Sequence, residues 1–340
     1  MSEHHFMGRA LELAELGRGT VSPNPMVGCV IVHAEKIVGE GYHRMYGEAH
    51  AEVNAVRSVH DEQILEDSTV YVTLEPCAHF SKTPPCSDLL ISKKVKKVVV
   101  ACRDPFEEVD GKGIEKLKNA GVEVELGLLG EEAISLNRRF FTYHQSKRPY
   151  VILKWAQTSD GFIARTNFDS KWISGPASRQ IVHRWRAEED AILVGKNTAV
   201  HDNPRLNVRD WHGPDPVRIL LDTNAEASEK LHLFDGTIKT LIFNQRRSEQ
   251  RGNTHWIQLE SLTPQAILVA LHQQGIQSLI VEGGSSTLNS FVQDNCWDEA
   301  RVFESEGSFG QGILAPNLNG EILQEKMIQN DRLTIYQNNG

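Results

Sequence analysis

Three residues in the first half of the chain have side chains that bind zinc in proteins: His50, Cys77 and Cys86. One imidazole and two thiolates give the metal three protein ligands and leave its fourth position for water, which is the pattern of catalytic zinc. Glu52 follows His50 by two residues, so it can take a proton from that water and pass it to a leaving amine. These residue types predict a hydrolytic deaminase of nucleobase-like substrates, with Glu52 as its catalytic residue.

The spacing of the two cysteines leaves an alternative open. Eight residues separate Cys77 from Cys86, whereas the common deaminase signature has about two between its cysteines. A structural zinc site would need a fourth protein ligand, and His79 is the candidate. We favour the catalytic interpretation because Glu52 has no purpose beside a structural metal.

Composition narrows the class of protein. A length of 340 residues predicts two domains, and a net charge of -9 argues against a nucleic-acid partner. No apolar run approaches the ~20 residues that cross a bilayer, and the N-terminus lacks the pattern of a signal peptide. The five cysteines are scattered and do not form a disulfide framework. We therefore expect a cytoplasmic protein without a membrane or nucleic-acid partner.

Strands alternate with helices in both halves, which is typical of α/β domains. In the first half we expect helices over 3–17, 51–59, 114–119 and 131–145, a helix after Cys86, and strands over 27–33, 36–43, 70–74, 97–101 and 122–126. In the second half we expect strands over 150–156, 191–194, 217–222, 240–243 and 278–281, an apolar strand between 301 and 312, and helices over 180–187, 264–273 and 286–294. The polar stretch 146–149 is expected to separate a domain of residues 1–146 from one of residues 149–340.

The segment 73–86, T-L-E-P-C-A-H-F-S-K-T-P-P-C, resembles the signature of the bifunctional riboflavin-biosynthesis deaminase–reductases, as do segments 23–28 and 39–43. The resemblance implies a cytidine-deaminase-like three-layer domain followed by a dihydrofolate-reductase-like domain. It implies that one zinc ion per chain supplies hydroxide to deaminate 2,5-diamino-6-(5-phosphoribosylamino)pyrimidin-4-one. The substrate pocket would then be lined by Asn24, His43, His79, Lys82 and Asp104, with Lys82 at the phosphate.

The second half carries one local signal of its own. In the segment 281–287 a strand runs into a glycine pair and then into a helix, whose free N–H groups suit a phosphate. An ordinary strand-to-helix turn explains that segment equally well. A G-x-G-x-x-G motif after a strand is missing, which argues against a Rossmann domain.

Segments 154–156, 160–161, 170–174, 184–187 and 190–195 resemble the reductase domain of the same family. The resemblance implies that NADPH reduces 5-amino-6-(5-phosphoribosylamino)uracil to its ribityl form. The implied cofactor contacts are Ala156, Trp172, Thr198, Asp202, Gly284, Ser285, Ser286, Thr287 and Leu288. The implied substrate contacts are Ser170, Arg186, Leu206, Arg209 and Glu282.

Competing interpretations remain open on sequence alone. The second domain could bind ligand or mediate assembly without reducing anything, and the first could be a zinc module without activity. A nucleic-acid deaminase is disfavoured by the acidic charge and by the cysteine spacing. The expected partner is a phosphorylated pyrimidine of low molecular mass, and the chain is expected to form a homodimer or homotetramer.

Overall fold

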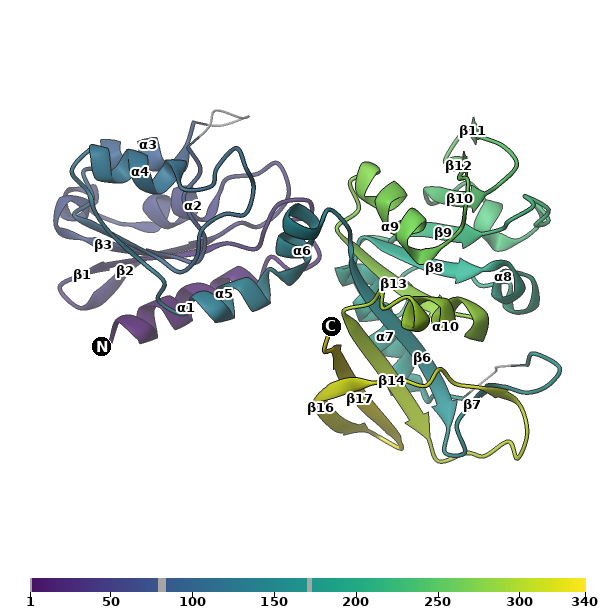
Figure 1. Ribbon diagram of the computed structural model, residues 1–340. Coiled ribbons are helices and arrows are strands. Elements are labelled where there is room, and N and C mark those ends of the chain that lie inside the picture. The colour runs from purple at the N-terminus through teal and green to yellow at the C-terminus, as the bar shows by residue number, and fades with distance from the viewer. Residues whose placement is uncertain (1, 79–83, 170–172) are drawn as a thin grey trace. The chain divides into compact units, whose positions relative to one another are not determined.

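The computed structural model describes residues 2–78, 84–169 and 173–340. It divides into two compact units, Met1–Ser146 and Lys147–Gly340 (Figure 1). In the described part of the chain, no helix has both the length and the apolar character needed to cross a membrane.

The first unit is built on a five-stranded sheet with the order β2-β1-β3-β4-β5. Strand β1 is antiparallel to both of its neighbours, whereas β3, β4 and β5 run parallel. The strands are β1 (Gly28–His33), β2 (Lys36–Tyr42), β3 (Thr69–Val72), β4 (Lys97–Val100) and β5 (Glu123–Leu126). The central strands are apolar on both faces, as expected for a sheet covered on both sides.

Helices cover both faces of this sheet. Its helices are α1 (Glu3–Glu15), α2 (Ala51–Ser58), α3 (Cys86–Ser92), α4 (Lys112–Asn119), α5 (Gly130–Leu136) and α6 (Arg138–Ser146), with a 3₁₀ turn at Glu62–Asp67. Alternate residues of β1 point to opposite faces: Ile31 packs with α2, and Val30 packs with α1. Figure 1 shows α2, α3 and α4 on one side of the sheet and α1 and α5 on the other. The predicted three-layer domain is confirmed.

The helix predicted over 131–145 is wrong in one respect, because it is two helices that meet at Asn137. The side chain of Asn137 is buried, and it accepts from Met26 N and donates to Met26 O, both at 2.8 Å. These two bonds tie the end of α5 to the loop before β1. No local pattern indicates this break, since both bonds span 111 residues.

The second unit contains a ten-stranded sheet with the order β11-β12-β10-β9-β8-β13-β6-β14-β17-β16. The strands from β12 to β14 in that order are parallel, and β11, β17 and β16 are antiparallel to their neighbours. The strands are β6 (Tyr150–Thr158), β8 (Ala191–Gly195), β9 (Val217–Leu221), β10 (Thr240–Asn244), β11 (Glu249–Arg251), β12 (Thr254–Gln258), β13 (Ser278–Gly283), β14 (Glu299–Ser305), β16 (Gly320–Ile328) and β17 (Asp331–Asn338). A separate pair is formed by β7 (Phe162–Ala164) and β15 (Ile313–Leu314).

Two helix layers enclose the parallel strands. The helices are α7 (Pro176–Glu188), α8 (Lys196–Asp202), α9 (Pro264–Gln273) and α10 (Ser285–Gln293), with a 3₁₀ turn at His232–Phe234. Leu271 and Phe291, from α9 and α10, pack on one face of the sheet, and Trp185 of α7 packs on the other. The predicted α/β class with a reductase-type second domain is confirmed. The short helix α8 and the hairpin of β16 and β17 lie outside the elements expected from sequence.

Candidate functional sites

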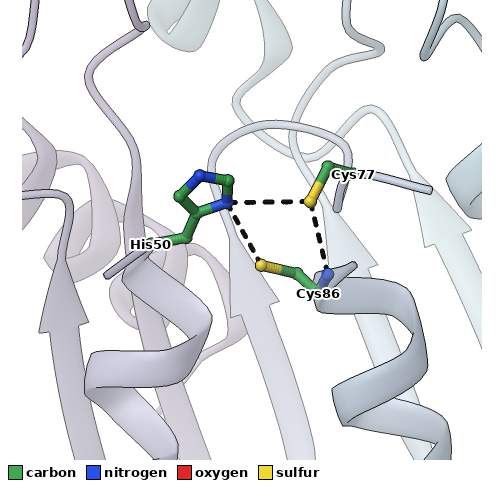
Figure 2. Close-up of side chains that lie close together, drawn as sticks. All are labelled: His50, Cys77 and Cys86. Atoms are coloured by element: carbon green, nitrogen blue, oxygen red, sulfur yellow. Dashed lines mark hydrogen bonds between the residues drawn. The ribbon is translucent and has the colours of Figure 1, made fainter. Parts of the chain in front are cut away.

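His50, Cys77 and Cys86 come together in the first unit (Figure 2). His50 is the residue before α2, and Cys86 is the first residue of α3. Cys77 lies in the loop that leaves β3. His50 Nδ1 lies 3.6 Å from Cys77 Sγ and 3.3 Å from Cys86 Sγ. The starts of α2 and α3 and the loop after β3 therefore bring one nitrogen and two sulfur atoms together.

These three atoms fit a zinc ion. With a Zn–S bond of about 2.3 Å and a Zn–N bond of about 2.05 Å, tetrahedral geometry separates nitrogen from sulfur by about 3.6 Å. The two nitrogen–sulfur distances of 3.6 and 3.3 Å agree with that separation. All three candidate ligand atoms lie within 4.8 Å of one another, so one ion can reach them together.

The two thiols differ in their readiness to ionise. The Cys86 side chain donates to Cys77 Sγ, and with His50 nearby this lowers the pKa of Cys77 to about 4 despite its burial. The Cys86 backbone N–H also points at Cys77 Sγ, at 3.3 Å. The same contact with Cys77, together with burial, raises the pKa of Cys86 well above its usual value. One thiolate is thus already favoured, which suits a cationic metal.

Glu52 lies in the first turn of α2 and is only 3% exposed. Burial, followed by the charge of Cys77, raises the pKa of its carboxyl group. A raised pKa makes the carboxyl group a stronger base than an ordinary glutamate, which suits a group that accepts and returns a proton. Its position two residues after His50 adds a buried carboxyl group to the cluster, separate from the three candidate ligand residues.

Of the residues expected to line the first pocket, Asn24 and His43 are in contact. Asn24 Nδ2 lies 3.1 Å from His43 Nε2, and His43 Nδ1 lies 3.2 Å from Ala49 O. Burial lowers the pKa of His43, which favours the neutral ring. The carbonyl oxygen of Ala49 can only accept, so Nδ1 carries the proton and Nε2 accepts from Asn24. The pair holds the Asn24 amide in one orientation.

Asp104 is 8% exposed, and burial raises the pKa of its carboxyl group to about 7. Its Oδ1 accepts from Phe106 N at 2.8 Å. The charge of Cys77 contributes to the raised pKa, which associates Asp104 electrostatically with the ligand cluster. His79 and Lys82, expected in the same pocket, lie outside the described residues.

Sequence reasoning missed Glu75, a buried carboxylate two residues before Cys77. Its Oε1 accepts from Gly113 N at 2.9 Å and from Ile114 N at 3.2 Å, and its Oε2 accepts from Gly111 N at 3.0 Å. These bonds fix the start of α4 against the loop that carries Cys77. The signal available in the sequence was an acidic residue placed directly after an apolar strand.

In the second unit, Arg186 and Glu282 form a two-pronged ion pair. Arg186 Nε lies 3.0 Å from Glu282 Oε1, and Nη2 lies 2.9 Å from Oε2. Burial raises the pKa of Glu282, but the charges of Arg186 and Lys154 outweigh it and bring the pKa to about 2. Two residues predicted to hold the substrate, from α7 and β13, therefore meet below the carboxyl ends of the parallel strands, where ligands of open α/β sheets bind.

Lys154 joins this pair, and sequence reasoning assigned it no role. Its Nζ lies 3.9 Å from Glu282 Oε2, and burial lowers the pKa of its ammonium group. It lies on β6 between buried Leu153 and Trp155. A lysine in the middle of an apolar strand was the signal that could have identified it. Burial thus makes the Lys154 ammonium group more acidic than that of an ordinary lysine.

The loop after α8 also contacts the Arg186–Glu282 pair. Arg186 Nη1 donates to Asn207 O at 3.3 Å, and Arg209 N donates to Nδ1 of the buried His183 at 3.4 Å. Leu206, in the same loop, is 2% exposed. The structure therefore gathers Arg186, Glu282 and the loop of Leu206 and Arg209, whereas Ser170 lies outside the described residues.

Several of the residues expected at the cofactor lie at the start of α10 or next to it. Gly284 is the residue before this helix, and no side chain caps its first N–H groups. A Cβ atom on Gly284 would lie 3.0 Å from Thr198 Oγ1, so the glycine allows α8 to approach closely. Ser285, Ser286, Thr287 and Leu288 form the first turn, Asp202 ends α8, and Ala156 lies on β6. Trp172 lies outside the described residues.

This arrangement suits a dinucleotide. A nine-residue helix that begins at a glycine, with hydroxyl side chains in its first turn, offers N–H and O–H donors to a diphosphate. Glycine and small side chains leave space for the backbone of the cofactor. The buried Lys154–Glu282–Arg186 group lies in the same domain, on β6, β13 and α7.

Comparison with known proteins assigns both units to families. A family model described as "Cytidine and deoxycytidylate deaminase zinc-binding region" matches residues 1–102, and one described as "RibD C-terminal domain" matches residues 149–314. Fold and site thus define a two-domain enzyme with a zinc-binding deaminase domain and a reductase domain that uses a nicotinamide cofactor.

The curated relatives extend over both domains. The riboflavin biosynthesis protein RibD of Aquifex aeolicus is 40% identical over 332 residues, covering 96% of this chain and 93% of that protein. RibD of Escherichia coli is 35% identical over 335 residues, covering 89% of this chain and 87% of that protein. The chain belongs to the RibD family of bifunctional deaminase–reductases of riboflavin biosynthesis, and the resemblance seen in the sequence is confirmed.

Solved structures agree over the full length. A diaminohydroxyphosphoribosylaminopyrimidine deaminase/5-amino-6-(5-phosphoribosylamino)uracil reductase from Thermotoga maritima has a TM-score of 0.90 and 36% identity, with 99% of each chain covered. RibD from Acinetobacter baumannii, in one crystal form, has a TM-score of 0.90 and 35% identity, with 98% of each chain covered.

Proposed function

We propose that the chain deaminates 2,5-diamino-6-(5-phosphoribosylamino)pyrimidin-4-one and then reduces the product, 5-amino-6-(5-phosphoribosylamino)uracil, with NADPH. The main support for this proposal is that one chain contains both groups of residues. The first is the His50–Cys77–Cys86 cluster with Glu52 beside it, and the second is the buried Lys154–Glu282–Arg186 group. The relative from Thermotoga maritima is itself named as a deaminase and reductase of such pyrimidines. We assign deamination to residues 1–146 and reduction to residues 149–340.

The deaminase step uses Glu52 as the proton carrier. Zinc, held by His50, Cys77 and Cys86, supplies a water with a pKa of about 7 when bound. Glu52 accepts a proton as the nucleophile attacks the amino-bearing ring carbon, and it delivers a proton to the departing amine, which leaves as ammonia. Its burial, with 3% exposure, keeps bulk water from competing for that proton.

The pocket residues orient the pyrimidine ring. The Asn24–His43 hydrogen bond fixes the Asn24 amide for contacts with ring nitrogen and oxygen atoms. Asp104, whose pKa of about 7 lets it carry a proton, can bind a ring N–H or amino group. We assign Lys82 to the substrate phosphate and His79 to substrate binding in the same pocket. One zinc ion per chain follows from the single cluster among the described residues.

The reductase step requires a hydride and a proton. The reduced nicotinamide would supply the hydride, so the proton must come from another group. The ribosyl ring opens when the bond between its anomeric carbon and ring oxygen breaks, and that oxygen must gain a proton. Lys154, buried and with a lowered pKa, gives this proton. Glu282, ionised beside Arg186, stabilises the ammonium form of Lys154 before transfer. The anomeric carbon then accepts the hydride and becomes the first carbon of a ribityl chain.

The remaining assignments complete the second site. Ser170, Leu206 and Arg209, with Arg186, bind the substrate, and the arginines suit its phosphate through paired N–H donors. The cofactor is assigned to Ala156, Trp172, Thr198, Asp202 and the segment 284–288. We further propose a homodimer or homotetramer, which size-exclusion chromatography with light scattering tests directly. A monomer at micromolar concentration would contradict this part of the proposal.

A coupled assay tests the function. The diaminopyrimidinone is given to purified protein with zinc, first without and then with NADPH, while ammonia and cofactor absorbance are followed. We expect ammonia in both reactions and cofactor oxidation only after ammonia appears. If deaminated product plus NADPH gave no oxidation at high enzyme concentration, the second domain would bind or assemble without turnover, and the reductase assignment would be wrong.

A further inference from the structure

Lys196 belongs to a small charged cluster at the carboxyl end of β9. Its Nζ lies 2.8 Å from Glu226 Oε2 and 3.7 Å from Asp222 Oδ1. Arg246, which follows β10, supplies a second cation and donates to Asn224 Oδ1 at 3.0 Å. The cluster thus contains two cations and two carboxylates, with Lys196 and, less strongly, Arg246 close enough to lower the pKa of Glu226.

The strand order places this cluster along the path of the proposed cofactor. Strand β6, which carries Ala156, and strand β8 lie on opposite sides of β13. If the nicotinamide lies near Ala156 and the diphosphate lies at the start of α10, the adenosine continues past β8 toward β9. A Cβ atom on Gly195 would lie 2.7 Å from Thr287 Oγ1, so Gly195 contacts the first turn of α10. Lys196 is the next residue, and its ion pairs with Asp222 and Glu226 place it toward the end of β9.

Asp222 explains why Lys196 is held at this position. The side chain of Asp222 is 2% exposed, and its Oδ2 accepts from Ala227 N at 2.6 Å. Its Oδ1 is buried and has no hydrogen-bond partner among the described residues, so its charge depends on Lys196 at 3.7 Å. Glu226 differs from Asp222, because its side chain is 61% exposed and can be changed without uncovering the core.

We propose that Lys196 reads the adenosine 2′-phosphate of NADPH and that Glu226 weakens this recognition. The 2′-phosphate is the one group that distinguishes NADPH from NADH. Glu226 forms an ion pair with the Lys196 ammonium group, and its negative charge repels a phosphate placed beside it. The protein therefore binds NADH nearly as well as NADPH. This inference rests on the proposed reductase function, and it identifies Glu226 as a specificity-determining residue of that site.

The test measures dissociation constants of NADPH and NADH by titration calorimetry on the full-length protein. Glu226→Gln is expected to tighten NADPH binding about five- to tenfold, since a unit charge a few ångströms from a phosphate has about that effect near a protein surface. NADH binding should stay within about twofold. Lys196→Gln should weaken NADPH binding and leave NADH binding within the same twofold range.

The matched control is Glu229→Gln. Glu229 is also exposed, and its partner Arg251 precedes the amino end of β12, at the opposite end of the parallel strands. This control should change neither dissociation constant. If Glu226→Gln shifted both cofactors equally or shifted neither, the inference would be overturned. If the wild-type protein bound neither cofactor, the cofactor assignment would fall as well, whereas binding without turnover would contradict only the proposed reduction.

Discussion

At the first site, the proposed role of Glu52 in proton transfer can be tested separately from the proposed role of the three ligand residues in zinc binding. Glu52→Gln keeps the shape of the side chain and removes its ability to carry a proton. We expect deamination to fall by about 10²–10⁴-fold, the usual contribution of a general acid–base residue. Zinc content, measured by atomic emission, should remain at one ion per chain, because the proposed ligands are His50, Cys77 and Cys86.

The exposed Glu48 provides the control for this substitution. Glu48→Gln removes a nearby charge without touching the buried position, and it should leave both zinc content and the deamination rate unchanged. Loss of zinc from Glu52→Gln would show that Glu52 holds the metal cluster together, and retention of full activity would place the proton carrier elsewhere.

The Arg186–Glu282 pair predicts a pH-dependent stability of the second unit. The pKa of Glu282 in the folded chain is about 2, below its ordinary value of 4.5, so ionised Glu282 stabilises the fold above pH 4.5. This contribution, about 3 kcal/mol by the size of the shift, is lost as the pH falls from about 5 toward 2. Denaturant unfolding of wild type and Glu282→Gln across this range measures it. The two free-energy curves should converge at low pH, and curves that stay parallel would contradict the assignment.

Some of the site residues can be recognised from the sequence alone, and others cannot. His50, Cys77 and Cys86 could be recognised because metal ligands are of few residue types and occur in a fixed order. Lys154 and Glu75 could not be assigned a role, because each looks like one charged residue among many until its buried partners are known. Glu75 gains its meaning from N–H groups of residues 111–114, which no local pattern connects to it.

At the scale of elements, the N-terminus of α7 is capped by Asp331, a residue from the last strand of the chain. Asp331, the first residue of β17, accepts from Gly175 N at 2.7 Å and from Ser178 Oγ at 2.5 Å. It therefore caps the helix that carries His183 and Arg186. Asp331→Ala should lower the free energy of unfolding by about 1–2 kcal/mol, the usual effect of losing a helix cap. Thermal unfolding followed by circular dichroism measures this loss.

Glu321 lies on the neighbouring β16 and is exposed, so Glu321→Gln is the control. It changes the charge of the same hairpin without removing a cap. The reductase rate of Asp331→Ala should also fall, because the start of α7 loosens. An unchanged unfolding temperature would mean that solvent replaces Asp331 at no cost.

Elements with strong periodicity could be predicted from sequence, and those set by distant contacts could not. The apolar strands β3, β4, β6 and β8 and the helix α9 were expected close to their observed bounds. The break between α5 and α6 depends on Asn137 and Met26, which are 111 residues apart. Strand β16 has no buried residue, so its sequence lacks the alternation that identifies a strand.

At the scale of the whole molecule, the two active sites belong to separate units with separate cores. Cys86→Ser removes one zinc ligand and should abolish zinc binding and deamination. Reduction of the deaminated pyrimidine should continue at the wild-type rate, because the Lys154–Glu282–Arg186 group is formed entirely by the second unit. Steady-state assays of each half-reaction measure this separation, and loss of both activities would show that the units depend on each other.

One chain is expected to perform deamination and then reduction, and a single stoichiometric assay tests this most directly. Wild-type protein receives a limiting amount of the diaminopyrimidinone with excess NADPH, and ammonia and oxidised cofactor are counted at completion. We expect one ammonia and one oxidised NADPH for each substrate molecule, with ammonia released first. Complete ammonia release with no cofactor oxidised, or cofactor oxidised without prior ammonia release, would contradict the order and the pairing of the two reactions.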